Sequence, residues 1–287
     1  MRIFLTGANG QLGRELARRL AGTEYLATDL PDLDISDAAA VADRIGSYRP
    51  DAVIHGAAWT QVDAAEEKPD LAWRVNAIGT QNIAMACRQV GAAMVYISTD
   101  YVFDGKLGRP YTEFDAVNPL SVYGRSKLAG EVLARQATDR LYVLRTAWLY
   151  GDGPNFVRTM LKLGQERDEL QVVDDQHGCP TSTVDLAEAA LRLLPTGRYG
   201  TYHAVNGGAT TWYGFAKKIF ELAGNTRVQV SPVTTAQFVR PAPRPEYSPL
   251  DTRLLRLALG WSPRPWEEAL AEYLAGEGML AKGGGQG

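Results

Sequence analysis

Residues 1–20, MRIFLTGANGQLGRELARRL, decide the fold class of this chain of 287 residues. The apolar run at 2–6 is typical of a strand that is buried on both faces. Glycines follow it directly, and residues 11–20 then show the amphipathic spacing of a helix. A strand, a glycine-rich turn and a helix in this order indicate a unit that binds a dinucleotide.

The three glycines have separate physical roles in such a turn. Gly7 allows the tight turn, Gly10 lets the backbone approach a pyrophosphate, and Gly13 lets the helix pack close to the strand. The free N–H groups and the positive dipole end at the start of the helix also favour phosphates. The spacing is G-x-x-G-x-x-G rather than G-x-G-x-x-G, and an ordinary strand-to-helix turn is the alternative. We expect the dinucleotide to contact Gly7, Gly10, Gln11, Leu12 and Gly13.

A second motif, SVYGRSK at 121–127, places Tyr123 and Lys127 one helical turn apart on the same face. A tyrosine has an ordinary pKa of about 10, and a nearby cation favours its phenolate. Tyr123 could therefore exchange a proton with a carbonyl or alcohol oxygen. The alternative is a plain surface pair on a helix.

The first half of the chain alternates between strand-like and helix-like segments, which predicts a parallel sheet with right-handed crossovers. Strands are expected at 2–6, 25–28, 52–56, 94–98 and 142–145. Helices are expected at 11–20, 37–47, 69–89 and 122–136. The predicted fold class is therefore α/β, a doubly wound, Rossmann-like parallel sheet that binds its ligands at the carboxyl ends of the strands.

Beyond residue 151 the alternation loosens, which indicates a smaller, discontinuous α+β lobe that binds the substrate. This part is expected to contain helices at 156–167, 184–194, 213–223, 252–259 and 266–274, a strand at 170–174 and an extended proline-rich loop at 232–249. We expect the dinucleotide-binding domain to comprise 1–150 and 181–205. The substrate lobe would comprise 151–180 and 206–287, with a flexible tail at 281–287.

Five further segments carry a resemblance to a known family. They are STDYVFDG at 98–105, YGRSKLAGE at 123–131, RTAWLYG at 145–151, DDQHGCPT at 174–181 and RPEYSPLD at 244–251. In order and spacing, and together with the glycine turn, they resemble the dTDP-4-dehydrorhamnose reductases of the extended short-chain dehydrogenase/reductase superfamily. The resemblance implies reduction of the C4 ketone of dTDP-4-dehydro-6-deoxy-L-mannose to dTDP-L-rhamnose, with NADPH or NADH as the cofactor.

The resemblance also implies three catalytic roles. Tyr123 would donate a proton to the ketone oxygen, and Thr99 would hydrogen-bond the same oxygen. Lys127 would hold the nicotinamide ribose and favour ionisation of Tyr123. A strand-end hydroxyl satisfied by the backbone is the alternative for Thr99.

Further contacts follow from the same resemblance. Asp100, Tyr101 and Trp148 would contact the substrate, Trp148 through a flat apolar face against the sugar or the thymine. Capping of a local turn is the alternative for Asp100, and packing between the lobes is the alternative for Trp148. The other cofactor contacts are expected at Asp34, Ile35, Ala58, Trp59, Thr60 and Ile97.

Asp29 follows the second expected strand, where a carboxylate can accept hydrogen bonds from the ribose hydroxyls of the adenosine and would repel a 2′-phosphate. This favours NADH over NADPH, although Arg14 could offset the preference and the resemblance allows both cofactors. A solvated loop carboxylate is the alternative.

The composition excludes several other classes of function. A net charge of −3 provides no basic surface for nucleic acid, and no run approaches the roughly 20 apolar residues that span a bilayer. Without a cationic leader and cleavage site, we expect a cytoplasmic protein with two free thiols. His55, His177 and His203 form no cluster in the sequence, so we expect no metal site. Exposed helix faces would permit a homodimer.

Two other functions stay open at this point. A nucleotide-sugar 4-epimerase or dehydratase uses the same tyrosine and lysine but retains and recycles its NAD; the segments at 174–181 and 244–251 argue against it. A non-catalytic regulatory subunit, resembling the beta subunit of methionine adenosyltransferase, would bind a partner protein instead. The presence of Thr99, Tyr123 and Lys127 argues against this second alternative.

Overall fold

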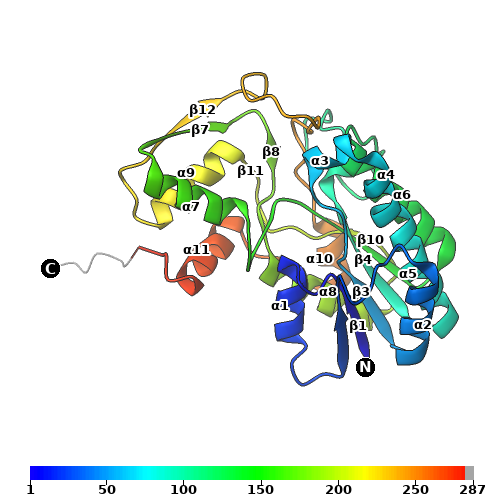
Figure 1. The fold of residues 1–287 in the computed structure, drawn as a ribbon. Helices are drawn as coiled ribbons and strands as arrows, with labels where there is room; N and C mark the ends of the chain where they lie inside the picture. Colours follow the sequence, from blue (N-terminus) through cyan, green and yellow to red (C-terminus); the bar gives the residue numbers. More distant parts are fainter. Residues whose placement is uncertain (282–287) are drawn as a thin grey trace.

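The computed structural model describes residues 1–281 and contains a central six-stranded sheet in the order β10-β5-β4-β3-β1-β2 (Figure 1). All neighbouring strands in it are parallel, which confirms the predicted doubly wound α/β fold. The strands are β1 (Ile3–Thr6), β2 (Tyr25–Thr28), β3 (Ala52–His55), β4 (Ala93–Thr99), β5 (Leu141–Thr146) and β10 (Gly200–His203). The sequence does not predict β10, because the residues GTYH contain no apolar run.

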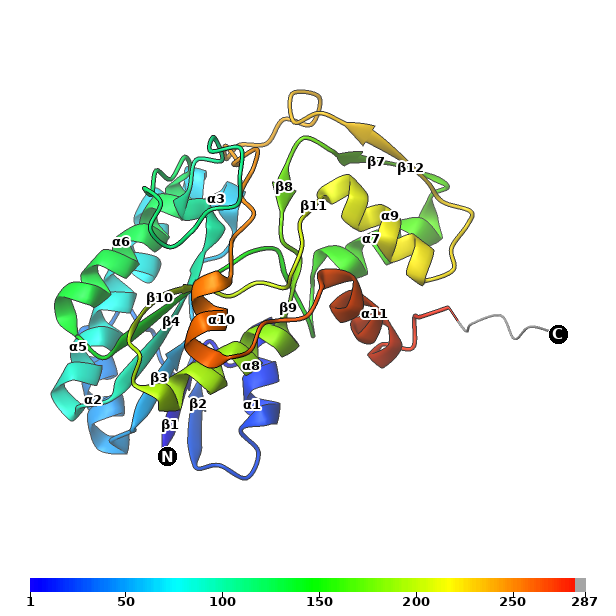
Figure 2. The ribbon, with the colours of Figure 1, turned by 180° about the vertical axis from the view of Figure 1, so that it is seen from behind.

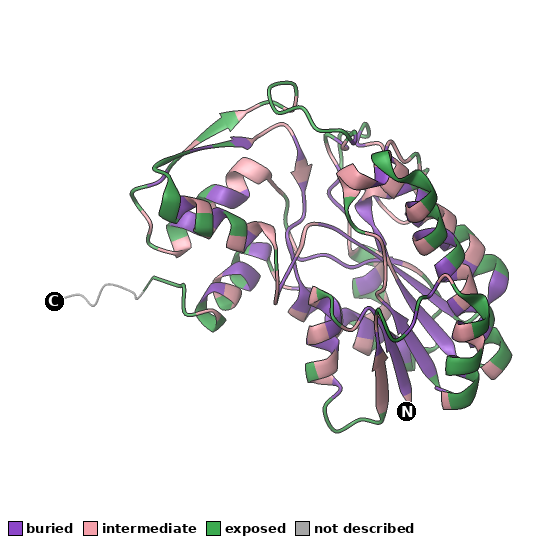
Figure 3. Ribbon diagram, viewed as in Figure 1, coloured by how far each residue is buried: buried purple, intermediate pink, exposed green. Residues whose placement is uncertain are grey.

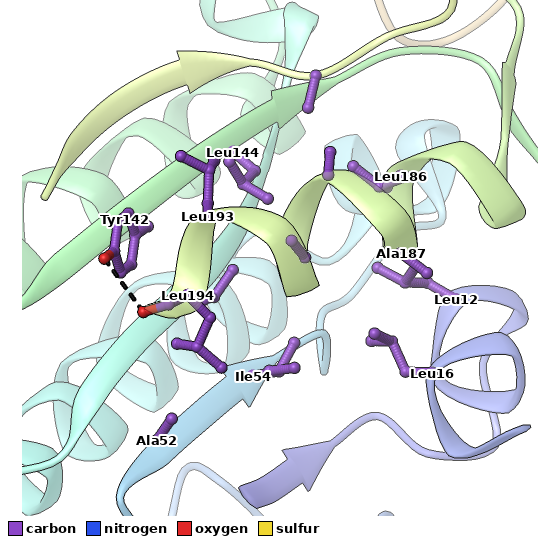
Figure 4. Close-up of a cluster of buried hydrophobic side chains, with 14 of the residues drawn as sticks. Leu12, Leu16, Ala52, Ile54, Tyr142, Leu144, Leu186, Ala187, Leu193 and Leu194 are labelled. Carbon is purple, nitrogen blue, oxygen red and sulfur yellow. Dashed lines mark hydrogen bonds between the residues drawn. The ribbon is translucent and has the colours of Figure 1, made fainter. Parts of the chain in front are cut away.

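The alternation of side chains along the strands supplies two cores, one on each face of the sheet. Leu5 and its neighbours on adjacent strands pack against α1 (Gln11–Arg19), α8 (Thr183–Leu193) and α10 (Arg253–Leu259), as Figure 4 shows for part of this layer. Phe4 contributes to the opposite face, beneath α2 (Ala38–Tyr48), α5 (Thr80–Val90) and α6 (Val122–Ala137). Figure 3 shows the central strands of the sheet buried and the outer helical surfaces exposed. Each fully buried aliphatic or aromatic side chain contributes roughly 1.5–3 kcal/mol to this layering.

The long helix predicted at 69–89 is interrupted. The chain forms α3 (Val62–Glu67), α4 (Pro69–Trp73) and a π-helical turn at Arg74–Gly79 before α5 begins. Inside that turn the Asn76 side chain is buried and hydrogen-bonded to backbone atoms of Trp59. A π-helical turn often marks a functional region, because it directs side chains that a regular helix would point elsewhere.

The second lobe lies beside the carboxyl ends of the strands (Figures 1 and 2). Its core gathers aromatic and aliphatic side chains from α7 (Phe156–Glu166), β7 (Glu169–Val173), α9 (Trp212–Leu222) and α11 (Trp266–Gly276). It also contains three pairs of short strands: β7 with β12 (Gln229–Val233), β8 (His177–Gly178) with β11 (Thr210–Thr211), and β6 (Leu149–Tyr150) with β9 (Thr181–Ser182).

Two features differ from the predictions for the second half of the chain. The sequence places 206–287 in the substrate lobe, but α10 packs with the sheet, because its Leu255 is buried in the same core as α8. The predicted loop at 232–249 begins inside β12, where Pro232 and Val233 continue the pairing with β7. In the tail, Ala281 donates a backbone hydrogen bond to Leu222, whereas 282–287 lie outside the described residues.

Candidate active site

A cleft of about 880 Å³ opens at the carboxyl ends of the strands, between the sheet and the second lobe. It brings together side chains or backbone from every position expected to bind cofactor or substrate. These are Gly7, Gly10, Gln11, Leu12, Gly13, Asp29, Asp34, Ile35, Ala58, Trp59, Thr60, Ile97, Thr99, Asp100, Tyr101, Tyr123, Lys127 and Trp148.

The glycine turn has the geometry that a diphosphate requires. Gly7 has a φ of 73°, and a Cβ there would lie 2.6 Å from the backbone nitrogen of Ala57. A Cβ on Gly13 would lie 2.1 Å from the carbonyl oxygen of Gly7, so α1 packs against the turn only with glycine at that position. The N-cap of α1 is Gly10, which supplies no side-chain cap for the helix. The N–H groups at this end of the helix therefore have no side-chain partner and remain available to bind a phosphate in the cleft.

Several polar side chains next to this turn line the same cleft. The Asp29 carboxylate accepts hydrogen bonds from the backbone N–H groups of Asn9 (2.9 Å) and Leu30 (2.8 Å). Gln11 Oε1, Thr28 Oγ1 and Trp59 Nε1 are buried and have no hydrogen-bond partner within residues 1–281. Buried polar atoms without a partner are costly, so these cleft-lining residues fit a polar ligand.

Helix α6 reaches the cleft because two of its glycines let it approach the neighbouring backbone. A Cβ on Gly124 would lie 2.2 Å from the carbonyl oxygen of Tyr101, and one on Gly130 would lie 2.4 Å from that of Asn76. The Ser121 side chain caps the start of the helix by accepting a hydrogen bond from the Gly124 N–H (3.1 Å). The first two turns of α6 thereby carry Tyr123 and Lys127 into the cleft.

The Lys127 ammonium is buried, with 3% of the residue exposed. Its Nζ donates to the carbonyl oxygen of Ile97 (2.7 Å) and lies 4.2 Å from the centroid of the Tyr96 ring. Burial lowers the pKa of Lys127 to about 7, against the opposing effect of the Glu131 carboxylate. Lys127 is thus held at the end of β4, and the charge of Glu131, one turn further along the same helix, favours its protonated form.

The pKa of Tyr123 is raised in this structure, whereas the sequence led us to expect that Lys127 would lower it and favour the phenolate. Burial raises the pKa of Tyr123 to about 12, the Thr99 hydroxyl lowers it in part, and the Asp100 charge raises it further. The phenol is therefore neutral near pH 7 when the cleft holds no ligand. A neutral phenol is the form that can donate a proton to a ketone oxygen.

Thr99 and Asp100 form a hydrogen-bonded unit at the end of β4. Thr99 Oγ1 accepts from the Tyr101 N–H (3.2 Å) and donates to Asp100 (3.1 Å). The Ser248 hydroxyl donates to the second oxygen of Asp100 (2.7 Å). Burial raises the pKa of Asp100 to about 6, and the bonds from Ser248 and Thr99 lower it in part. Thr99, rather than Asp100, caps the local turn.

A buried ion pair lies beneath these groups. Arg145 donates to both carboxylate oxygens of Glu131 (3.0 and 2.8 Å), and Ser98 donates to the same carboxylate (2.6 Å). Although burial raises it, the hydrogen bonds and charge of Arg145 hold the pKa of Glu131 below its ordinary value. Glu131 lies one turn after Lys127, so the pair connects α6 with the ends of β4 and β5.

Sequence reasoning missed several residues that shape the cleft. Asn76 joins the backbone of Trp59 (2.8 and 3.0 Å) to the Ser126 hydroxyl (3.0 Å), and so ties the segment 58–60 to α6. Thr146 and Trp212 line the cleft directly. Asn76 lies within the helix predicted at 69–89 and Trp212 directly before the one predicted at 213–223, and neither pattern carries a signal of a site. Ser248 belongs to the quoted segment 244–251.

Two absences concern the part of the chain that the structure describes. No group of three or more His, Cys, Asp or Glu side chains in residues 1–281 is arranged to hold a metal ion. None of the helices in the same range combines the length and the apolar character needed to cross a bilayer.

Comparison with known proteins identifies the family of this chain. The family model described as the RmlD substrate binding domain matches residues 1–278. A dTDP-4-dehydrorhamnose reductase of Streptomyces griseus is 46% identical over 281 residues, which cover 94% of this chain and 92% of the relative.

Two solved structures are similar over almost the whole chain. The dTDP-4-dehydrorhamnose reductase of Clostridium acetobutylicum has 50% identity and a TM-score of 0.95, covering 97% of this chain and 100% of the relative. That of Bacillus anthracis, in complex with NADP, has 44% identity and a TM-score of 0.93, covering 96% and 99%. This chain therefore belongs to the RmlD substrate-binding-domain family, to which the sequence motifs pointed.

Proposed function

We propose that this protein reduces the C4 ketone of dTDP-4-dehydrorhamnose to dTDP-L-rhamnose, with NADPH or NADH as the reductant. The observation that carries the proposal is the convergence of the glycine turn, Tyr123, Lys127 and Thr99 on one cleft. The relatives named as dTDP-4-dehydrorhamnose reductases support the same substrate for this chain.

The residues present fit a nicotinamide dinucleotide. The turn at 7–13 would hold the diphosphate, Asp29 the adenosine ribose, and Lys127 the nicotinamide ribose. A bound reduced nicotinamide supplies the hydride for the ketone carbon. Gln11, Thr28 and Trp59 offer buried polar atoms that such a ligand would satisfy.

The protein itself supplies the proton and the orientation. The ketone oxygen gains negative charge during reduction, and the neutral Tyr123 phenol lines the cleft as a group that can donate a proton to it. The Lys127 side chain lines the same cleft, and its Nζ is held in place by the hydrogen bond to the carbonyl oxygen of Ile97. Because the Thr99 hydroxyl donates to Asp100, a bond from Thr99 to the ketone requires this hydroxyl to rotate away from Asp100.

We further propose that Asp29 shifts the cofactor preference towards NADH. Its carboxylate lines the cleft and would repel a 2′-phosphate. The relative from Bacillus anthracis was solved with NADP, so we expect this chain to accept both cofactors.

One assay tests the reductase function. The unstable 4-keto sugar is generated with the dehydratase and the 3,5-epimerase, and NAD(P)H absorbance is followed after addition of this protein. Stoichiometric oxidation with formation of dTDP-L-rhamnose is expected.

Other results of the assay separate the alternatives. Tightly bound NAD that is recycled without net NAD(P)H consumption would indicate an epimerase or a dehydratase. Absence of turnover together with tight binding to a synthetase partner would indicate a regulatory subunit. If reduction proceeds equally well when the 3,5-epimerase is left out, the stereochemistry assigned to the substrate would have to change.

A further inference from the structure

Trp148 lines the cleft in a backbone conformation that needs support from its surroundings. Its φ is 45°, in the left-handed region that a residue with a bulky side chain rarely adopts. Such conformations persist where the surrounding structure over-determines them, and they cluster at ligand sites. The contacts that hold this indole are therefore informative about the site.

Trp212 supplies the first of these contacts. The two indole rings are stacked, with centroids 3.6 Å apart and an angle of 9° between the planes. Phe156 packs against Trp212 in turn, with ring centroids 4.6 Å apart. One face of Trp148 is therefore covered by an aromatic stack that continues into the core of the second lobe.

Gly178 supplies the second contact. A Cβ on Gly178 would lie 2.4 Å from Cε2 of Trp148, so no larger residue fits without moving the indole. Strands β8 and β11 pair Gly178 with Thr210 and His177 with Thr211, and Trp212 follows directly. This short sheet thus brings both supports to the same side chain, which gives the segment 174–181 a physical role.

The position of Trp148 indicates which part of the substrate it meets. Thr146 at the end of β5 pairs in register with Thr99 at the end of β4. Trp148 follows two residues later, which places it next to the catalytic end of the cleft. The hexose carries the reacting ketone, so the hexose is the part of the nucleotide-sugar that lies there.

We propose that Trp212 and Gly178 are positioning residues that fix the Trp148 indole beside the hexose ring of the substrate. The inference rests on the proposed reductase function and assigns roles to two residues outside the catalytic set. It predicts that loss of either support weakens binding of the sugar and leaves binding of the nicotinamide cofactor intact.

The test compares Trp212→Leu, Trp212→Phe and Gly178→Ala with the unaltered protein. Loss of the stack should raise KM for the 4-keto sugar nucleotide and Kd for dTDP-L-rhamnose, measured by calorimetry, about 3- to 10-fold. The phenylalanine variant should recover most of this loss. Gly178→Ala should act in the same direction, and the Ki of dTDP alone and the Kd of NADPH should stay within about twofold.

Trp261→Leu is the matched control, because Trp261 also stacks with a neighbour, Arg192, but lies outside the cleft. It should change neither KM nor Kd. An unchanged KM in Trp212→Leu and Gly178→Ala, or an equal rise in the Ki of dTDP, would overturn the proposal. Absence of ketone reduction by the unaltered protein would instead refute the reductase function, so the two failures are distinguishable.

Discussion

The sheet half and the second lobe are built in different ways. In the sheet half, β1, β3, β4 and β5 are mostly apolar with polar residues at their carboxyl ends, and all of their residues but one are buried. In the lobe, the strand pairs join segments far apart in the chain, and β6, β8, β9 and β11 have two residues each. A local apolar pattern determines the strands of the sheet. The short strands of the lobe instead depend on pairing with a segment far away in the chain, and closing the loop between the two costs entropy.

The difference extends to charge. The sheet half contains a buried, hydrogen-bonded ion pair, Glu131 with Arg145, of which 0% and 5% of the side chains are exposed. The lobe contains pairs such as Arg227 with Asp168, of which 57% and 66% are exposed. Burial removes the screening by water, so an equivalent change should have unequal effects in the two regions.

The largest expected effect is on stability. Glu131→Ala leaves the Arg145 guanidinium buried without its carboxylate, which should lower the free energy of unfolding by about 3–5 kcal/mol. Asp168→Ala, the matched change in the lobe, should cost under about 1 kcal/mol. Denaturant unfolding of both variants gives the measurement. If both variants lose the same free energy of unfolding, burial does not make the Glu131–Arg145 pair more important for stability than the exposed pair.

The next effect is on the proposed chemistry, whose candidate residues lie in the sheet half. Tyr123→Phe removes the phenol that we propose as the proton donor, so turnover should fall by about 10²-fold or more while the Kd of NADPH stays the same. Stopped-flow or steady-state absorbance of NADPH measures the rate. Tyr199→Phe, outside the cleft, is the control and should retain full activity. Near-normal turnover of the first variant would remove Tyr123 from the reaction.

The same contrast explains what the sequence could predict. Five of the six strands of the sheet and the sites at 7–13 and 123–127 follow from local spacing, and they converge because parallel strands end at one edge of the sheet. The edge strand β10 was missed, since its residues show no period and its place depends on pairing with β5. Asn76, Ser248 and Trp212 were missed as well, because each acts through a partner that is distant in sequence.

A third prediction concerns pH. Burial, with a further effect of the Arg145 charge, lowers the pKa of His203 to about 3, well below the value of about 6.5 that it has in the unfolded chain. The folded state therefore binds fewer protons, and the stabilisation from neutral His203 is present above pH 6.5 and lost as the pH falls towards 3. Between pH 7 and pH 5 the free energy of unfolding should fall by about 2 kcal/mol through this residue.

His203→Asn isolates that contribution. Asparagine does not titrate but can still donate a hydrogen bond to the Tyr111 carbonyl oxygen, which His203 Nδ1 contacts at 3.1 Å. Denaturant unfolding at pH 7 and at pH 5 should show a pH dependence that is weaker by about 2 kcal/mol in the variant. An identical pH dependence in both proteins would show that His203 is not the titrating group.

The smallest expected effect tests the cofactor end of the cleft. Asp29→Asn removes the charge and keeps an oxygen that can accept the hydrogen bond from the Asn9 N–H. A unit charge near a phosphate in water is worth about 1 kcal/mol, so kcat/KM for NADPH relative to NADH should rise by about fivefold. Asp29→Ala also leaves the two backbone N–H groups without their acceptor, so it should weaken binding of both cofactors in addition. An unchanged ratio of kcat/KM for NADPH to that for NADH in Asp29→Asn would mean that the carboxylate only stabilises the glycine turn. Other residues of the cleft would then distinguish the two cofactors at the 2′-position.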